Sequence, residues 1–212
     1  MSPAVADELF LITHDLQSGK PRISDQYMGG GLAAALLGEL VLAGCVAIGT
    51  GGRLSLGEYG PPPERLTEQL YEQTRNDLFA GEVSVRDWLG RHGREAESSV
   101  ADRLVRAGDL RRETSRRLGR QVVRHHPVKP AEMFMRAQRL PSYLRHRVEV
   151  TEADVLIARL AQILAPGGSV LELDEVAREY LSQLVPALQP SLQELLAVVD
   201  SSFTSGVRGP YF

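Results

Sequence analysis

"GLAAALLGELVLAGCVAIG", residues Gly31 to Gly49, contains a single charged residue, Glu39. Its nineteen residues reach the lower length limit of a helix that spans a bilayer. The carboxylate lies at the centre of the run, however, and Gly44 ends the helical pattern before the run is complete. We therefore predict a buried helix from Met28 to Ala43 rather than a membrane span.

The residues after this helix predict a β-hairpin. Val46 and Ile48 alternate with small residues, and Leu54 and Leu56 alternate in the same way after the turn Thr50-Gly51-Gly52. Two short alternating runs separated by a glycine-rich turn are typical of a hairpin. The apolar side chains of the two strands are expected to face each other and to belong to the core.

A second stretch repeats this pattern. "ELVLAGCVAI" (Glu39 to Ile48) and "RLVRAGDLRR" (Arg103 to Arg112) share Leu, Val, Ala and Gly at equal offsets. Each predicts a helix, a glycine and then a hairpin, with Gly44 and Gly108 in the left-handed conformation that often follows a helix C-terminus. The first hairpin is apolar, so we assign it to the core. The second is rich in arginine and is expected to be exposed, because guanidinium groups cannot be buried without partners.

The rest of the sequence is typical of a mainly α-helical protein. Apolar residues recur at helical spacing, and proline or glycine separates the segments. Thr151, followed by Asp154 three residues later, predicts the N-cap of one helix. Besides the helix at 28–43, helices are predicted at about 64–79, 84–91, 98–108, 130–140, 141–148, 151–164, 173–188 and 190–200.

The composition indicates one soluble globular domain, residues 1–212. An apolar content of 43% and a charged content of 24% allow a hydrophobic core and do not indicate disorder. Cys45 is the only cysteine, so no internal disulfide can form and a reducing compartment is expected. The first ten residues, MSPAVADELF, carry acids where a signal peptide has a basic region. We therefore expect a cytoplasmic protein.

The positive charge is concentrated in one segment. Residues 101–147 contain twelve arginines and Lys129 against four acidic residues, a net charge of +9, whereas the whole chain carries −3 and the remainder therefore −12. The densest part, RRETSRRLGRQVVRHHPV at 111–128, holds six arginines in the second predicted hairpin. Such a segment indicates an anionic partner, either nucleic acid or a membrane surface. The alternative is pairing within the chain, for example with the acidic helix that contains Glu64, Glu68 and Glu72.

A helix followed by a basic hairpin is also typical of a winged-helix DNA-binding domain, whose wing touches phosphates. The residues just before Arg111 supply Asp102, Arg103 and Arg106 and lack the Asn, Gln or Ser groups that read base edges. Nucleic acid is therefore the less favoured partner. Charge alone does not separate the phosphate of DNA from that of a lipid headgroup.

No pattern in the sequence indicates catalysis. "GCVAIGTG" at 44–51 has glycines at the spacing of a phosphate-binding loop, but no lysine follows them and the segment opens a hairpin. The five histidines show no metal-ligand spacing, and we assign the adjacent His125 and His126 to the basic surface. No Ser, Cys or Asp lies in a nucleophile elbow. We expect a protein that is not an enzyme, with no catalytic residues, no metal site and no cofactor.

An ordered set of motifs resembles the Golgi phosphoprotein 3 family, which also has bacterial members. The motifs are DELFLITHD, GLAAALLGELVLAGCVAI, SVRDWLG, VADRLVRAGDL and HPV, and they span Asp7 to Val128. The C-terminal helices match the family by pattern only. The resemblance implies a compact bundle of hydrophobic helices ringed by amphipathic helices, with a small core hairpin and a protruding basic β-hairpin. It also implies peripheral membrane association through phosphatidylinositol 4-phosphate, oligomers that involve the hairpin, and client membrane proteins, since eukaryotic members retain glycosyltransferases.

The four positions of the family's lipid pocket are only partly matched. Arg94 matches one of the pocket arginines. The pocket tryptophan falls at Ser24, and the other two arginines fall at Ala33 and Glu97. Because a glutamate in place of an arginine reverses the local interaction with phosphate, the resemblance does not extend to strict specificity for phosphatidylinositol 4-phosphate.

The predicted partner is an anionic or phosphoinositide membrane lipid, and the predicted location is cytoplasmic and peripherally membrane-associated. Besides the winged-helix regulator, the alternative function is an oligomerising adaptor for other proteins. An arginine near an anionic leaflet contributes about 1 kcal/mol, so three or four of them give roughly 3 to 4 kcal/mol of reversible binding. Leu118, Val122 and Val123 add shallow apolar insertion, unless the two valines pack against the body of the protein. The predicted lipid-binding residues are Arg94, Arg111, Arg112, Arg116, Arg117, Arg120 and Arg124.

Overall fold

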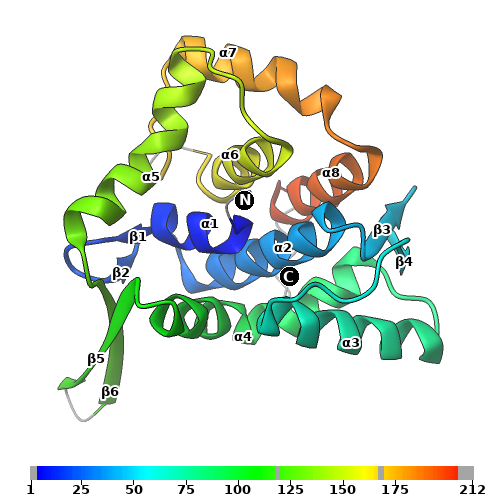
Figure 1. Ribbon diagram of the computed structural model, residues 1–212, viewed down its shortest axis with the longest axis horizontal. Coiled ribbons are helices and arrows are strands. Elements are labelled where there is room, and N and C mark those ends of the chain that lie inside the picture. Colours follow the sequence, from blue (N-terminus) through cyan, green and yellow to red (C-terminus); the bar gives the residue numbers. More distant parts are fainter. Residues whose placement is uncertain (1–3, 118–119, 167–169, 205–212) are drawn as a thin grey trace.

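A computed structural model describes residues 4–117, 120–166 and 170–204 (Figure 1). The described residues form eight α-helices, one short 3-10 helix and three antiparallel strand pairs, which confirms a mainly α-helical protein. The helices are α1 (Val5–Thr13), α2 (Asp25–Leu42), α3 (Arg65–Ala80), α4 (Val85–Arg106), α5 (Pro130–Arg145), α6 (Glu152–Leu164), α7 (Glu175–Leu184), η1 (Val185–Ala187) and α8 (Pro190–Thr204). The strand pairs are β1 (His14–Asp15) with β2 (Lys20–Pro21), β3 (Val46–Gly49) with β4 (Arg53–Leu56), and β5 (Leu110–Arg117) with β6 (Arg120–Pro127).

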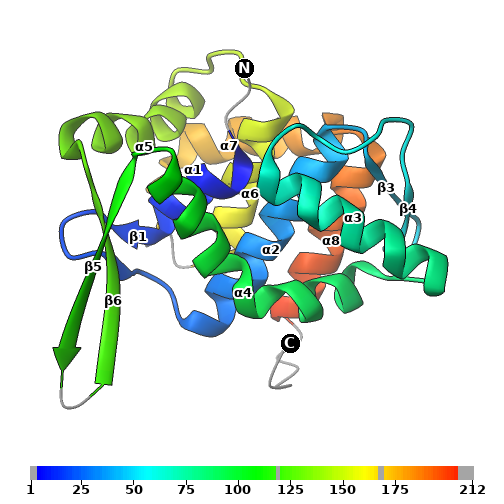
Figure 2. The ribbon, with the colours of Figure 1, turned by 60° about the horizontal axis from the view of Figure 1, so that its bottom comes forward.

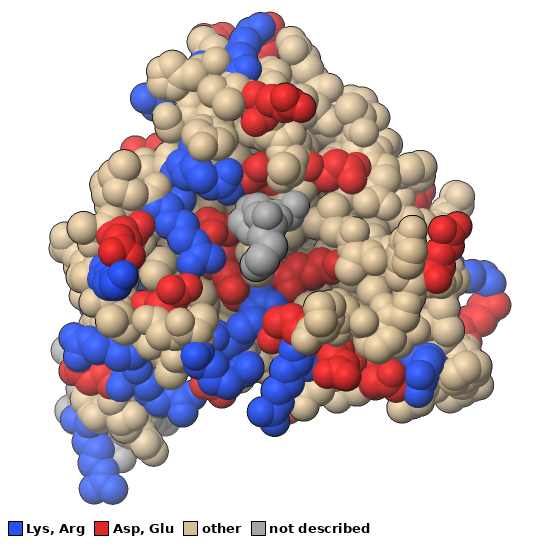
Figure 3. Space-filling model, viewed as in Figure 1, with Lys and Arg blue, Asp and Glu red and all other residues tan. Residues whose placement is uncertain are grey.

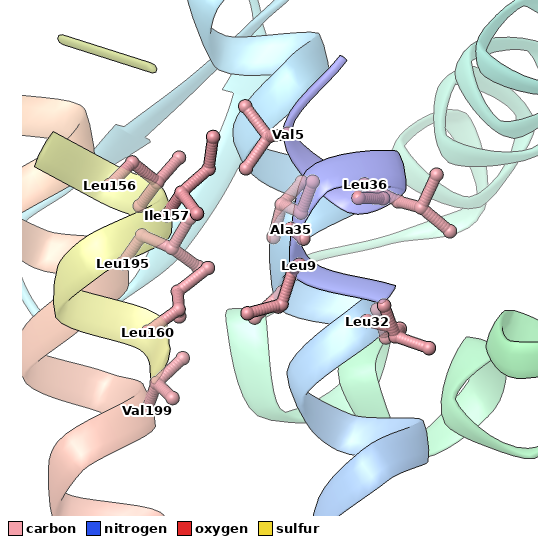
Figure 4. Packing of buried hydrophobic residues seen from close by; sticks show 14 of the residues in the cluster. Val5, Leu9, Leu32, Ala35, Leu36, Leu156, Ile157, Leu160, Leu195 and Val199 are labelled. Atoms are coloured by element: carbon pink, nitrogen blue, oxygen red, sulfur yellow. The ribbon is translucent and has the colours of Figure 1, made fainter. Parts of the chain in front are cut away.

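Helices α1 and α2 form the centre of the protein, as the apolar run predicts. Every residue of α1 is buried, and α2 is buried along most of its length. Apolar side chains from α1, α2, α6 and α8 pack in this core (Figure 4). Those labelled in Figure 4 are Val5, Leu9, Leu32, Ala35, Leu36, Leu156, Ile157, Leu160, Leu195 and Val199. Among the described residues, no helix is both long enough and apolar enough to cross a membrane.

Glu39, the one charge of the apolar run, is neutralised inside the protein by Arg103 of α4. The Arg103 guanidinium donates hydrogen bonds of 2.8 and 3.0 Å to the two oxygens of Glu39, and its Nε donates one of 2.8 Å to Asp7 of α1. Glu64, at the start of α3, accepts a weaker bond of 3.4 Å. A buried carboxylate is tolerated when a cation and hydrogen bonds satisfy it. This cluster joins four helices, and Glu39 and Arg103 occupy equivalent positions in the two repeated stretches.

Both repeated stretches fold as a helix, a left-handed glycine and a hairpin. Gly44 and Gly108 have φ values of 69° and 80°, which confirms their prediction as helix-ending residues. In the first hairpin, Val46 pairs with Leu56 and Ile48 pairs with Leu54, so the apolar residues of the two strands face each other as expected. The assignment of this hairpin to the core is confirmed for Val46, Ile48 and Leu54, which are buried, and is wrong for Leu56, which is exposed near the end of the hairpin.

Two predicted helix breaks are wrong. The segments at 84–91 and 98–108 form the single helix α4, because Gly93 lies where this helix crosses α2. A Cβ on Gly29 of α2 would lie 2.4 Å from the carbonyl oxygen of Gly93, so the two backbones are in direct contact. Helix α5 likewise continues through Pro141. Proline removes one backbone hydrogen bond, but Pro141 is buried together with Leu144, and this packing keeps the helix continuous.

The N-cap prediction for α6 is confirmed. The Thr151 hydroxyl accepts a hydrogen bond from the backbone N–H of Asp154, and the Asp154 carboxylate accepts one from the backbone N–H of Thr151. The sequence Pro166-Gly167-Gly168 is expected to end this helix, and its two glycines lie outside the described residues.

Candidate anion-binding surface

The pair β5–β6 carries most of the predicted site residues. It extends away from the helices at the lower left of Figures 1 and 2. Side chains alternate between the two sides of a strand, and residues paired directly across the ladder lie on the same side. One side therefore contains Arg112, Thr114 and Arg116 with His125, Val123 and Gln121, and the other contains Arg111, Glu113 and Ser115 with His126, Arg124 and Val122.

The base of this hairpin is fixed to the body of the protein. Leu110 and Pro127 are buried, and the backbone N–H of Val128 donates a 2.9 Å hydrogen bond to the carbonyl of Asp109. The Arg112 guanidinium forms an ion pair with Asp102 of α4. The ring of His125 lies edge-on to that of Phe10 in α1, with centroids 6.3 Å apart. These contacts hold the base in place while the rest of the hairpin extends outward.

The arginines of the basic segment fall into two groups. Those outside the hairpin mostly bind carboxylates of the body: Arg103 binds Asp7, Glu39 and Glu64, Arg136 binds Glu8 and Asp109, Arg139 binds Asp154, Arg145 binds Asp174, and Arg147 binds Glu179. The expectation of pairing within the chain therefore holds for these residues, including the pairing of Arg103 with Glu64.

Most of the described hairpin arginines lack such partners. The side chain of Arg111 is 65% exposed and its nearest carboxylate oxygen, on Glu113 of the same strand, is 3.9 Å away. Arg116 is exposed and Arg124 is half-buried, and neither forms an ion pair with a described residue. Of the hairpin arginines whose side chains the structure describes, only Arg112 binds a carboxylate of a helix. In Figure 3, Lys and Arg side chains gather at the lower left, where this hairpin lies.

Part of the predicted site lies outside the described residues. This applies to the side chains of Arg117 and Arg120, although the backbones of these two residues pair with each other, and to Leu118. Val123 is exposed and Val122 is half-buried.

The positions that match the family's lipid pocket differ in their accessibility. Arg94 is exposed on α4, eight residues before Asp102 and hence about 12 Å from it along the helix. Ala33 has no exposed surface, so it cannot contact a ligand. Ser24 is exposed just before α2. Glu97 lies one turn after Arg94, with its Oε1 3.5 Å from Nε2 of the buried His14.

His125 and His126 of the hairpin are both predicted to extend the basic surface, and this prediction is wrong for His125. Burial lowers the pKa of His125, and Arg112 and His14 lower it further, so this ring is neutral at pH 7. His126 instead lies 3.7 Å from Glu113. No local sequence pattern indicates this difference, because the burial of His125 depends on Phe10, which is 115 residues away in the chain.

Comparison with known proteins assigns the family. The family model described as Golgi phosphoprotein 3 (GPP34) matches residues 5–197. The chain belongs to this family. The match to the Golgi phosphoprotein 3 family includes α6, α7 and most of α8, which resembled the family by pattern only. A search of curated proteins found no match. Among the described residues, no group of three or more His, Cys, Asp or Glu is arranged to hold a metal ion.

Proposed function

We propose that this member of the Golgi phosphoprotein 3 family is a peripheral membrane protein that binds anionic lipid headgroups through the arginines of β5–β6. The observation that supports the proposal is the division of the basic segment. Arginines outside the hairpin are largely neutralised by carboxylates of the body, whereas Arg111, Arg116 and Arg124 have no carboxylate partner on the helices as far as the structure describes them. These three side chains are therefore available to lipid phosphates.

The expected binding energy is that of weak, reversible adsorption. Arginines close to an anionic leaflet contribute about 1 kcal/mol each. Arg111 and Arg124 lie on one side of the hairpin and Arg116 on the other, so the three described arginines give at most about 3 kcal/mol. The Glu113 carboxylate on the same hairpin reduces this value. Screening limits the attraction to a Debye length, about 8 Å at physiological ionic strength, so binding weakens as salt is added. A second copy of the chain bound at the hairpin would strengthen adsorption through avidity.

Which anionic lipid the protein prefers depends on residues outside the hairpin. Arg94 on α4 supports recognition of a phosphoinositide headgroup, and Glu97, one turn away, opposes it. We therefore propose a general preference for anionic lipids over strict recognition of phosphatidylinositol 4-phosphate. We also propose that the protein is cytoplasmic and is not an enzyme. It forms oligomers through the hairpin and associates with client membrane proteins.

The proposal is tested by flotation with vesicles of phosphatidylcholine alone, or mixed with phosphatidylserine or phosphatidylinositol 4-phosphate, at two salt concentrations. The wild type is expected to float with both anionic mixtures, and less at the higher salt concentration. The variant Arg111→Ser/Arg116→Ser/Arg124→Ser is expected to lose this binding without a large change in melting temperature, because these side chains form no ion pair with the described residues of the body.

A matched control changes the net charge equally at other places. Arg53, Arg86 and Arg147 lie on β4, at the start of α4 and just after α5, and their replacement by serine also removes three positive charges. This control is expected to float like the wild type. Equal flotation of the hairpin variant and the wild type would reject the hairpin as the contact. A sequence-dependent shift of duplex DNA at physiological salt would instead favour the winged-helix alternative.

A further inference from the structure

A groove between α5, α6 and α7 collects three arginines far from the hairpin. Helix α7 lies across the top of Figure 1, and β5–β6 lies at the lower left. The groove has a volume of about 710 Å³, which is within the range of small-molecule sites. Its lining residues are Arg145, Arg159, Ala161, Gln162, Ala165, Pro166, Leu171, Glu172, Leu173, Asp174 and Arg178.

Asp174 holds two of these arginines side by side. Its Oδ2 accepts a 2.8 Å hydrogen bond from Nε of Arg145, and its backbone carbonyl accepts one of 3.3 Å from Nε of Arg178. Its Oδ1 accepts a hydrogen bond from the backbone N–H of Ala177, as the N-cap of α7. This backbone bond, with the nearby Arg145, lowers the pKa of Asp174, so the carboxylate remains ionised and its ion pair with Arg145 persists at neutral pH. The contact of Arg178 with the backbone carbonyl does not depend on this charge.

Arg145 and Arg178 are thus fixed through Nε alone. Their terminal guanidinium nitrogens have no protein partner among the described residues. Arg159 adds a third guanidinium from α6, held by Gln162 at 3.3 Å and by Asp200 at 3.1 Å. Two guanidinium groups with free terminal N–H groups match the geometry of phosphate oxygens, which accept paired hydrogen bonds from each fork.

One wall of the groove is apolar, although Gln162, Glu172 and Asp174 also line it. Ala161 and Leu171 are buried at its wall, and Ala165, Pro166 and Leu173 extend this surface. The lining carries three arginines against Glu172 and Asp174, which leaves a net charge of +1. A ligand that fits both features has one strongly anionic group and one compact apolar group.

We infer that this groove binds a small organic phosphate, a monoester in which a phosphate group carries a compact apolar substituent. The phosphate lies between Arg145 and Arg178, and the substituent contacts the apolar wall. A lipid headgroup and a soluble ester share this phosphate chemistry. The soluble ester is the expected ligand, because the groove lies away from the hairpin that is proposed to contact the membrane.

The inference is tested by calorimetric titration of the full chain with phenyl phosphate and, separately, with inorganic phosphate, both at constant ionic strength. Phenyl phosphate is expected to bind about tenfold more tightly than inorganic phosphate, because its ring buries apolar surface. In Arg145→Gln/Arg178→Gln the affinity for phenyl phosphate is expected to fall by at least about tenfold, because the charge-assisted hydrogen bonds are lost. Arg147→Gln, next to the groove, and the triple hairpin variant are expected to bind like the wild type.

The single variant Arg178→Gln keeps the test decisive if the double variant does not fold, because among the described residues the Arg178 side chain donates a hydrogen bond only to a backbone carbonyl. Wild-type affinity in Arg178→Gln or in the folded double variant would overturn the inference. Equal binding of phenyl phosphate and inorganic phosphate would overturn it as well. Loss of phenyl phosphate binding in the hairpin variant would place the ligand at the other surface, and binding only to vesicles that contain phosphatidic acid would replace the soluble ester by a lipid headgroup.

Discussion

Replacing Asp7 by asparagine is expected to stabilise the protein at neutral pH and to have little effect at pH 4. Asp7 lies in the buried cluster with Arg103, Glu39 and Glu64. Burial disfavours its ionised form and raises its pKa from 3.8 to about 6, although the Arg103 guanidinium acts in the opposite direction. Asparagine keeps a side-chain oxygen that accepts the hydrogen bond from Arg103 but never carries a charge.

The sign of the expected change in unfolding free energy follows from proton linkage. Between pH 3.8 and about 6 the folded state holds a proton on Asp7 that the unfolded state has released. The stability that this group contributes is therefore fully present below pH 3.8 and is lost as the pH rises through 6. One pKa unit corresponds to about 1.4 kcal/mol, so a difference of about two units corresponds to a loss on the order of 3 kcal/mol.

The assay is urea unfolding, followed by circular dichroism, of the wild type and Asp7→Asn at intervals from about pH 4 to pH 8. The unfolding free energy of the variant minus that of the wild type is expected to rise from near zero to on the order of 3 kcal/mol. Asp15→Asn is the control. The backbone N–H of Ser18 lowers the pKa of Asp15 below 3.8, so the stability that this group contributes changes below pH 3.8, and the difference between this variant and the wild type is expected to stay nearly constant from pH 4 to pH 8. A difference for Asp7→Asn that is constant with pH, or that falls, would refute the reasoning.

The other predictions concern packing, the buried cation and one helix cap. Arg103→Met leaves buried carboxylates without their cation and is expected to lower the unfolding free energy by about 3 to 5 kcal/mol in urea titrations; a loss below about 1 kcal/mol would contradict the cluster. Gly29→Ala is expected to cost about 1 to 3 kcal/mol, because its Cβ meets the α4 backbone at 2.4 Å. Gly60→Ala, with no atom within 4 Å of its Cβ, is the control, and equal melting temperatures for the two variants would argue against the close contact. Thr151→Ala removes half of the capping box of α6 and is expected to cost about 1 kcal/mol in thermal unfolding; an unchanged melting temperature would contradict this.

The candidate site was predictable only in part. The arginine-rich hairpin is visible in the sequence because its residues are neighbours in the chain. Arg112 and His125 differ from the other hairpin residues in ways that the sequence does not indicate, since one binds Asp102 on α4 and the other packs against Phe10 on α1. The groove at α5, α6 and α7 had no sequence signal, because Arg145, Arg159 and Arg178 come from three separate helices.

By itself, the sequence determined the buried helix α2, the glycines that end α2 and α4, the register of the first hairpin and the cap of α6. Each of these depends on the conformational preferences of residues within a few positions of one another. The tertiary structure decided whether α4 and α5 are continuous and which arginines remain available at the surface. Continuity depends on packing against other helices, and the availability of an arginine depends on whether a carboxylate distant in the sequence lies within hydrogen-bonding distance. Most arginines outside the hairpin meet such a carboxylate, and Arg111, Arg116 and Arg124 of the described hairpin do not.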